Sequence, residues 1–326
     1  MNIGLIDIDY NSSFPNIPLM KISAYHKAHG DNVHWYNTLL TGRCDIVYMA
    51  KVFSWTENYN YPIDADKVIY GGTGFQIKTI NGMETMITPE DDKRIFIKEL
   101  PDEIEHIYPD YSLYGDLTKN TAYGFLTRGC PRGCNFCHVG TKEGYRSRKV
   151  ADLTEFYNGQ SNIVLCDPNI LACKDWRDLL EQLVDSGAKV DFNQGLDVRL
   201  MTEEKAQLLT NCKTNSIHFA WDNYNDKDII IDKLQLFRRV YEQKHKWYIN
   251  GTISVYVLVN FNTTFEQDLD RIYTLRNLGY WAYVMVYNKK ESDVRYRHLQ
   301  RWVNNRLIFA QCNNFDNYMK KQHSPV

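Results

Sequence analysis

Three cysteines stand close together near the middle of the 326-residue chain, at Cys130, Cys134 and Cys137. Their C-x3-C-x2-C spacing places three thiols on one short loop, and thiolates are soft ligands that suit iron–sulfur clusters and zinc. Gly129 and Gly133 permit backbone conformations that are closed to other residues, so the loop can wrap around a bound group. Three ligands for a four-iron cluster leave one iron open, and an open position is what separates catalytic from structural metal sites.

Two other interpretations of this loop stay open. Structural zinc needs a fourth ligand, usually from a second C-x2-C pair, and the sequence has no such pair. His138 adjoins Cys137, which makes joint ligation of one ion awkward. A zinc-binding or inert loop is therefore the alternative to an iron–sulfur site.

The remaining cysteines are scattered, which argues against a second cluster: Cys44, Cys166, Cys173, Cys212 and Cys312.

The cysteine loop follows a small α/β segment at the N-terminus. A helix pattern covers residues 19–29, with Pro18 at its start and Gly30 just past its end. Strands that alternate with a helix predict a parallel, doubly wound sheet, and residues 100–116 resemble a crossing linker. The strand patterns of this segment lie at residues 2–9, 33–36, 45–52 and 67–70.

A second run of strands begins just before the cysteines. Helix patterns separate most of them, at residues 176–187 and at 263–279, where Thr263 and Glu266 form an expected capping box. This alternation predicts a partial (β/α)6 barrel, in which the chemistry gathers at the carboxyl ends of the strands. The six strand patterns lie at residues 122–127, 162–166, 190–193, 216–221, 254–259 and 282–287.

The cysteine loop, with Phe136 just before its third cysteine, resembles the signature of the radical S-adenosylmethionine (SAM) superfamily. The order of segments is similar to that of the subgroup with an N-terminal cobalamin-binding-like domain. The segment DPNI follows the second barrel strand, and FNQGLDVRLMTEE follows the third. The resemblance implies an α/β chain with a doubly wound Rossmann-like domain at residues 1–115, a partial (β/α)6 radical SAM barrel at 116–288 and a helical extension at 289–326.

The resemblance also implies a reaction. The open iron of a [4Fe–4S] cluster on the three cysteines would chelate SAM through its amino and carboxylate groups. One electron from a flavodoxin- or ferredoxin-type donor would then cleave the sulfonium bond. The resulting 5′-deoxyadenosyl radical would abstract hydrogen from a substrate that the sequence does not identify. The cofactors supply this chemistry, and the protein supplies binding and orientation.

Three residues near the first two barrel strands match positions that contact SAM in the family. Phe136 would lie near the adenine, and the alternative is that it packs under the loop. Asp167 and Asn169 follow the second strand, where the family places polar contacts to the methionine amino group. The alternative for this pair is turn formation, because Asp-Pro-Asn is good turn chemistry.

Four further residues follow the third and fourth strands, and they are Gln194, Asp197, Arg199 and Asp222. The guanidinium of Arg199 could clamp a carboxylate in a bidentate manner, and Asp197 could accept ribose hydroxyls. A plain Asp197–Arg199 ion pair is the other interpretation. Asp222 ends the fourth strand and points toward the same edge of the sheet.

The first domain lacks the histidine that serves as lower cobalt ligand in some family members. Its loop at residues 10–16 has no histidine, and the turn at 71–74 is a glycine turn of a common kind. Cobalamin also binds without such a ligand, so cobalamin remains an open cofactor. The sequence favours a degenerate domain. A cobalamin-dependent methyltransferase is the enzymatic alternative, and a non-catalytic zinc or iron–sulfur module is the alternative from another class.

Composition limits the partners. The formal net charge is −2, so no global field attracts a nucleic-acid backbone, and a small molecule or peptide is the expected substrate. The stretch 295–302 mixes cations with aromatics, but Leu299, Trp302 and Val303 predict a helix packed on the barrel.

No run of roughly 18 apolar residues is present, and the cysteines form no disulfide framework. We therefore expect a cytoplasmic protein without a membrane partner.

Overall fold

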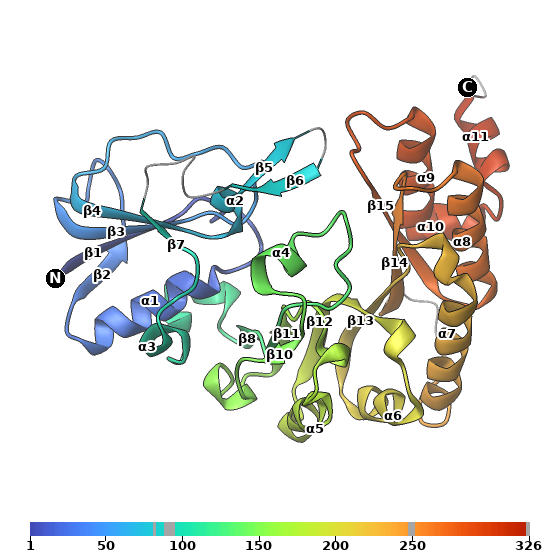
Figure 1. The fold of residues 1–326 in the computed structure, drawn as a ribbon, viewed down its shortest axis with the longest axis horizontal. Coiled ribbons are helices and arrows are strands. Elements are labelled where there is room, and N and C mark those ends of the chain that lie inside the picture. The colour runs from blue at the N-terminus through green and yellow to red at the C-terminus, as the bar shows by residue number, and fades with distance from the viewer. Residues whose placement is uncertain (81–82, 88–94, 247–251, 324–326) are drawn as a thin grey trace. The chain divides into compact units, whose positions relative to one another are not determined.

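The structure of the chain is a computed structural model, which describes residues 1–80, 83–87, 95–246 and 252–323. These residues divide into two compact units, Met1–Val164 and Leu165–Val326 (Figure 1). Each unit contains a sheet with parallel strands, so the chain is an α/β protein. The domain limits that the sequence suggests, near residues 115 and 288, remain predictions.

The first unit contains a parallel sheet of five strands among its described residues, in the order β2-β1-β3-β4-β7. All four predicted strands of this segment are present, and a short fifth strand joins them. Because β2 and β3 lie on opposite sides of β1, the strand order reverses between β1 and β3. The strands are β1 (Asn2–Asp7), β2 (Asn32–Trp35), β3 (Cys44–Ala50), β4 (Ala65–Gly71) and β7 (Ile95–Ile97).

Helix α1 (Ile17–Ala28) packs on this sheet. It begins two residues before the predicted start, because the side chain of Asn16 accepts a hydrogen bond from the backbone N–H of Leu19 at 3.1 Å and caps the first turn. Leu19 and Ile22 are buried in one cluster with strand residues that include Ile3 and Leu5. The apolar face of α1 therefore fixes the helix against β1.

The remaining elements of the first unit are short. The expected linker at 100–116 is not extended throughout, because it contains α3 and most of a 3₁₀ helix at Tyr111–Leu117. The elements are α2 (Thr73–Gln76), β5 (Ile77–Ile80), β6 (Met83–Met86), α3 (Asp102–Glu105), β8 (Thr121–Gly124), β9 (Thr127–Arg128), α4 (Val139–Glu143), β10 (Arg148–Lys149) and β11 (Asn162–Leu165).

A second large sheet follows the chain order, β8-β11-β12-β13-β14-β15, among the described residues. All six predicted strands are present, and β12 to β15 pair in parallel. Helices connect the strands of the second unit, because neighbouring parallel strands need a crossover connection. These elements are α5 (Trp176–Ser186), β12 (Lys189–Leu196), α6 (Glu203–Asn211), β13 (Thr214–Ala220), α7 (Lys227–Tyr241), β14 (Ile253–Val259), α8 (Phe265–Asn277) and β15 (Trp281–Val286).

The ends of two helices test the sequence signals directly. Helix α5 ends at Gly187, which adopts the left-handed conformation with φ 62° as predicted. The capping box of α8 is one residue later than predicted. Thr264 has extended backbone angles and exchanges hydrogen bonds with Gln267, at 3.2 and 3.0 Å, so Thr263 and Glu266 do not form the box.

Up to residue 323, where the description of the chain ends, three α-helices follow β15: α9 (Val294–Asn304), α10 (Arg306–Gln311) and α11 (Phe315–His323). Leu299, Trp302 and Val303 are fully buried on α9, as the sequence predicted, and α9 packs on β15. The indole N–H of Trp302 donates to the carbonyl of Cys312 at 3.0 Å and ties α9 to the end of α10. None of the helices in the described part of the chain is long and apolar enough to cross a bilayer.

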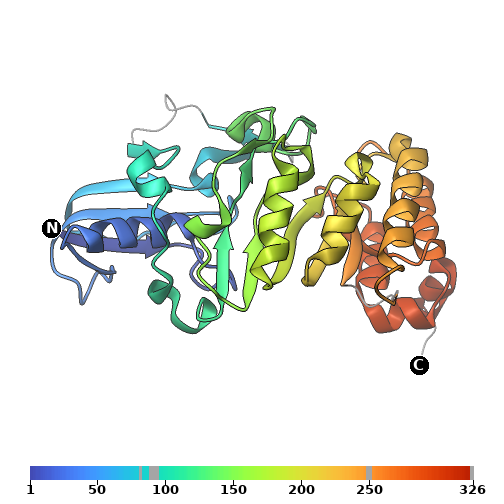
Figure 2. The same cartoon turned by 90° about the horizontal axis from the view of Figure 1, so that it is seen from below.

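The second unit buries one face of its strands under helices. Helices α5 to α8 lie along one side of these strands in Figures 1 and 2. Phe219 of β13 meets Phe237 of α7 edge to face, with 5.0 Å between the ring centroids. Both rings are completely buried. Burial of large apolar side chains on this face is the main stabilising term of the unit.

Replacement of Phe237 by alanine should lower the free energy of unfolding by about 3–5 kcal/mol, because a fully buried ring leaves a cavity. Urea denaturation followed by circular dichroism measures the loss. Ile229→Ala is a matched control on the same helix, since Ile229 is 43% exposed, and it should cost about 0.5 kcal/mol. Equal losses for the two variants would contradict the packing described here.

Candidate functional site

The cysteine loop connects β9 to α4 in the first unit. Cys130, Cys134 and Cys137 are partly exposed, whereas the other five cysteines of the chain are buried. The backbone N–H of Cys137 donates to the carbonyl of Cys134 at 3.0 Å, so the last two cysteines lie on one turn. Phe136 is half-buried within this turn. Partial exposure suits thiols that must bind a group entering from solvent.

Gly129 is required by the close packing at the start of the loop. Its φ is +83°, and a Cβ atom there would stand 2.3 Å from the carbonyl oxygen of Arg146. The following N–H, that of Cys130, donates to the carbonyl of Gly144 at 3.1 Å. Gly133 also has a positive φ, of +56°. Both glycines singled out in the sequence therefore adopt conformations that favour glycine.

A partly buried ion pair holds the base of the loop. One carboxylate oxygen of Glu143 lies 2.8 Å from Nη1 of Arg128, and the other accepts a hydrogen bond from the N–H of Gly129 at 3.1 Å. The guanidinium of Arg128 also lies over the ring of Phe125, 3.4 Å from its centroid. Antiparallel pairing of β9 with β10 closes the base. The backbone of the loop is thus fixed by the chain itself.

The donor set of this loop fits an iron–sulfur cluster. Three soft thiols stand on one loop whose glycines and ion pair hold the backbone, and sulfur donors are what such clusters require. Among the described residues, no three His, Cys, Asp or Glu side chains stand together as a metal-ion site. The fit therefore rests on the chemistry and placement of the donors along the loop.

The residues predicted to contact SAM after the second barrel strand follow β11 closely. Asp167 and Asn169 are 5% and 2% exposed, although both are polar. The carbonyl of Asn169 accepts a hydrogen bond from the N–H of Ala172 at 3.2 Å, which starts a 3₁₀ helix. Burial of both side chains favours a structural or ligand-binding role over a solvated turn.

Arg199 makes two ion pairs at the carboxyl end of β12. Its Nε lies 2.8 Å from Asp197, and its Nη1 contacts Asp226. The Asp197–Arg199 pair, one of the two sequence-based interpretations, is therefore present. Gln194 lies on β12 itself and is exposed. An arginine bound to two carboxylates binds a further anion less readily than a lone guanidinium, because its charge is already compensated.

A buried ion pair that the sequence did not reveal joins the ends of β13 and β14. Arg271 is completely buried on α8, and its guanidinium donates to the carbonyls of Trp221 and Leu258 at 2.6 and 2.7 Å. The same guanidinium contacts Asp268, which is also fully buried. Asp268 accepts from the N–H of Asn260 at 2.9 Å. The only sequence signal was an Asp and an Arg three residues apart on an otherwise apolar helix face.

Asp222, predicted from the sequence, lies next to this network. Burial raises the pKa of its carboxyl group to about 6, and the positive charges of Arg271 and Arg199 oppose that rise. A carboxyl group with such a pKa exchanges protons near neutral pH, which is a property of many functional sites. Structural ion-pair networks produce the same effect, so the pKa alone assigns no role.

The other face of the second-unit strands carries a polar strip that the sequence analysis missed. We define this strip by Asp191, His218, Tyr256 and Tyr283. His218 stacks on Tyr256 with 4.6 Å between ring centroids, and its Nδ1 lies 2.6 Å from Ser254 Oγ. Tyr256 pairs with Tyr283 across β14 and β15, and Tyr283 is 44% exposed. Burial lowers the pKa of His218, so its imidazole is neutral at pH 7.

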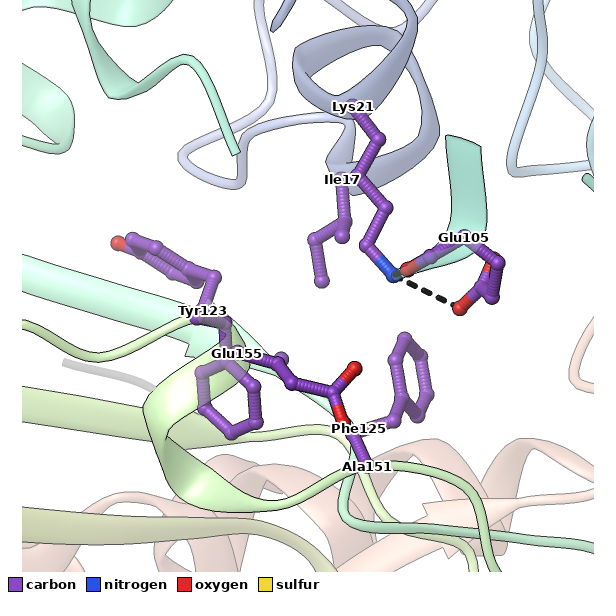
Figure 3. Close-up of a pocket in the computed structure, with 9 residues that line it drawn as sticks. Ile17, Lys21, Glu105, Tyr123, Phe125, Ala151 and Glu155 are labelled. Carbon is purple, nitrogen blue, oxygen red and sulfur yellow. Dashed lines mark hydrogen bonds and ion pairs between the residues drawn. The ribbon is translucent and has the colours of Figure 1, made fainter. Parts of the chain in front are cut away.

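A small cavity in the first unit is lined by none of the three loop cysteines (Figure 3). Lys21 of α1 reaches across it to the carboxylate of Glu105 at 2.7 Å. Tyr123, Phe125 and Glu155 line its other side. Its volume of about 10 Å³ accommodates a single water molecule, so it is an internal packing defect and not a ligand site.

Comparison with known proteins finds similar solved structures but no sequence relative. No family model and no curated protein matches the sequence. The fold is similar to a solved structure of the cobalamin-dependent S-adenosylmethionine radical enzyme OxsB with aqua-cobalamin bound, with a TM-score of 0.53 and 9% identity. The likeness covers 93% of this chain and 55% of the other, so this chain spans about half the length of that protein. At this identity the likeness concerns the fold alone.

Gly129→Ala should impair assembly of the loop, because the new Cβ would overlap the carbonyl of Arg146 and a side chain at this φ costs about 1–3 kcal/mol. Gly144→Ala is the matched control, since its φ is +97° but no atom lies within 4 Å of its Cβ position. After anaerobic reconstitution with iron and sulfide, the Gly129 variant should retain less iron than the Gly144 variant. Equal iron content would show that the close contact is not needed.

The raised pKa of Asp222 predicts a pH-dependent stability. The folded state binds this proton up to about pH 6, whereas an unfolded aspartate releases it near pH 4. Stability from this group is therefore complete below pH 4 and is lost as the pH rises to about 6, a loss of about 3 kcal/mol. Asp222→Asn should remove that loss. Urea titrations of both proteins at pH 4 and pH 7 give the difference, and parallel behaviour would refute the assignment.

Proposed function

We propose that the chain is a radical SAM enzyme. Cys130, Cys134 and Cys137 hold a [4Fe–4S] cluster whose fourth iron binds SAM. The observation that carries the proposal is the loop itself, with three partly exposed cysteines on a backbone fixed by Gly129 and by the Arg128–Glu143 pair. The likeness in fold to a SAM radical enzyme supports it. When bound, the cluster and SAM supply reductive cleavage to a 5′-deoxyadenosyl radical.

The chain contributes binding and orientation. Arg128 and Glu143 hold the start of the loop that carries the three thiols. In this proposal Phe136 covers the adenine, and Asp167 and Asn169 accept hydrogen bonds from the amino group of methionine. The burial of Asp167 and Asn169 supports this assignment, because water does not compete with the ligand there.

The carboxyl edge of the second-unit strands serves the rest of SAM. Arg199 acts as a positioning residue that holds Asp197 and Asp226. Because its charge is already compensated, Arg199 is a weaker candidate for binding the carboxylate of SAM. Asp197 is the stronger candidate of the two, and it would accept hydrogen bonds from the ribose hydroxyls. Gln194 and Asp222 contact the same ligand. With its pKa of about 6, the Asp222 carboxyl is mostly ionised at pH 7 and can accept a hydrogen bond from a ligand hydroxyl or amino group.

The substrate is a small molecule or peptide that binds on the polar strip. Tyr283 and Met285 are exposed on this face, and a carboxylate, a neutral imidazole and two phenols lie within it. Partly exposed rings with a few polar groups are typical of small-ligand sites. The electron donor is a flavodoxin- or ferredoxin-type protein. Two alternatives are a cobalamin-dependent methyltransferase, favoured by the aqua-cobalamin in the similar structure, and a non-catalytic zinc or iron–sulfur module.

Cys134→Ala should abolish release of 5′-deoxyadenosine from SAM and lower the iron content, because two thiolates hold a four-iron cluster poorly. The assay uses protein reconstituted without oxygen and reduced with dithionite, followed by chromatography of the nucleoside. Cys212→Ala is the matched control, because Cys212 is buried in the second unit, and it should retain activity. Wild-type protein that holds one zinc ion, no sulfide and yields no deoxyadenosine would contradict the proposal.

A further inference from the structure

The first-unit sheet has one edge at which a cofactor would be expected. In open α/β sheets, ligands bind outside the carboxyl ends of the strands, at the point where the strand order reverses. Here that point lies between β1 and β3, and the loops that follow these strands flank it. The loop after β3 begins with residues 51–58, which we call the edge segment.

Asp9 ties the edge segment to the loop after β1. One of its carboxylate oxygens accepts the N–H of Val52 at 2.5 Å and that of Phe53 at 3.4 Å. The other accepts the hydroxyl of Thr56 at 2.6 Å. Asp9 is only 6% exposed, and the N–H of Ile8 donates to the carbonyl of Ala50 at 3.0 Å. Hydrogen bonds to a shielded carboxylate are strong, so the two loops meet across the switch point.

The glycine turn after β4 is filled by the same segment. A Cβ at Gly72 would stand 2.3 Å from the carbonyl oxygen of Lys51, and one at Gly74 would stand 2.7 Å from that of Phe53. The N–H of Gly74 donates to the carbonyl of Lys51 at 2.9 Å. Gly72 and Gly74 are thus needed because the chain's own backbone packs against them. In a turn that binds a ligand, the space at their Cβ positions would be left free for that ligand.

Side chains of the edge segment bind one another as well. The ammonium group of Lys51, which is 4% exposed, donates to the side chain of Asn58 at 2.9 Å. The rings of Phe53 and Trp55 stack with 4.8 Å between centroids. The segment is therefore an ordered cover with its own internal contacts.

We propose that the edge segment permanently closes the switch point of the first unit, and that this unit takes no cobalamin. The loops after β1, β3 and β4 are bonded to one another at the place where a flat cofactor would have to enter. The similar solved structure contains aqua-cobalamin, and this chain departs from it in chemistry while sharing its fold. The reaction of this chain then proceeds without cobalt as a methyl carrier, which removes the methyltransferase alternative.

A direct test uses the purified full-length chain and hydroxocobalamin. After incubation with an excess of hydroxocobalamin, gel filtration should separate the protein from the coloured cobalamin completely. Co-elution at one cobalamin per chain would overturn the proposal. The readout is the absorbance of cobalamin and needs no cluster, so the result is independent of whether the chain cleaves SAM.

A second test examines the edge segment itself. Asp9→Ala should increase the rate of chymotryptic cleavage after Phe53 and Trp55, because the carboxylate that holds the segment is lost. Asp45→Ala is the matched control, since Asp45 lies near the start of β3 and accepts an N–H, that of Asn2 at 2.6 Å, away from the segment. It should leave that rate unchanged. If Asp9→Ala does not fold, Thr56→Val, which removes one bond to Asp9, should give a smaller increase in the same direction. Unchanged cleavage in the folded Asp9 or Thr56 variant would overturn the proposal.

Discussion

A parallel sheet leaves its backbone polar groups unpaired at the edge where the strands end, and the chain must satisfy them. Each unit meets this constraint in its own way. In the first, the carboxylate of Asp9 collects N–H groups from the loop after β3. In the second, the guanidinium of Arg271 collects carbonyls from the ends of β13 and β14. In the first unit the carboxylate binds N–H donors, and in the second the guanidinium binds carbonyl acceptors. The charged group at the carboxyl ends of each set of strands therefore affects which ligands can bind there.

Two arginines of the second unit, Arg271 and Arg199, show how the surroundings of a side chain set its role. Arg271 has no contact with solvent, so its charge is compensated by Asp268 and by carbonyl dipoles. Arg199 is partly exposed and is compensated by Asp197 and Asp226. The charges of both arginines lower the pKa of Asp222, but the effect of burial is larger and the pKa rises. The carboxyl ends of these strands therefore combine a fully buried ion pair with a partly exposed one, and Asp222 interacts electrostatically with both.

The sequence predicted the order of strands and helices well, because apolar periodicity and helix-ending glycines such as Gly187 report local structure. It misplaced the capping box of α8 by one residue, since Thr263 and Thr264 are each followed three positions later by a side chain that can accept a hydrogen bond. Only the backbone angles decide between them. The cysteine loop was recognised because all its donors are local in sequence.

The features that were missed depend on contacts between distant residues. The role of Asp9 depends on its hydrogen bond from the N–H of Val52, which is 43 positions away in the sequence. No local sequence pattern predicts that bond. Arg271 and Asp268 look like a surface pair on a helix until the helix is placed against β14. In β14 the run ISVYVLV is apolar except for Ser254 and Tyr256, and the sequence does not show which of its two faces the helices cover.

The ion pair between Arg128 and Glu143 has a consequence for the order in which the protein matures. These residues and Gly129 join the base of the cysteine loop through contacts between protein atoms, so in the proposed enzyme these backbone contacts would not require iron. This differs from zinc fingers, whose chains are unfolded without metal. If the proposed cluster is inserted into this loop, its insertion and its loss would therefore leave the backbone contacts at the base of the loop in place.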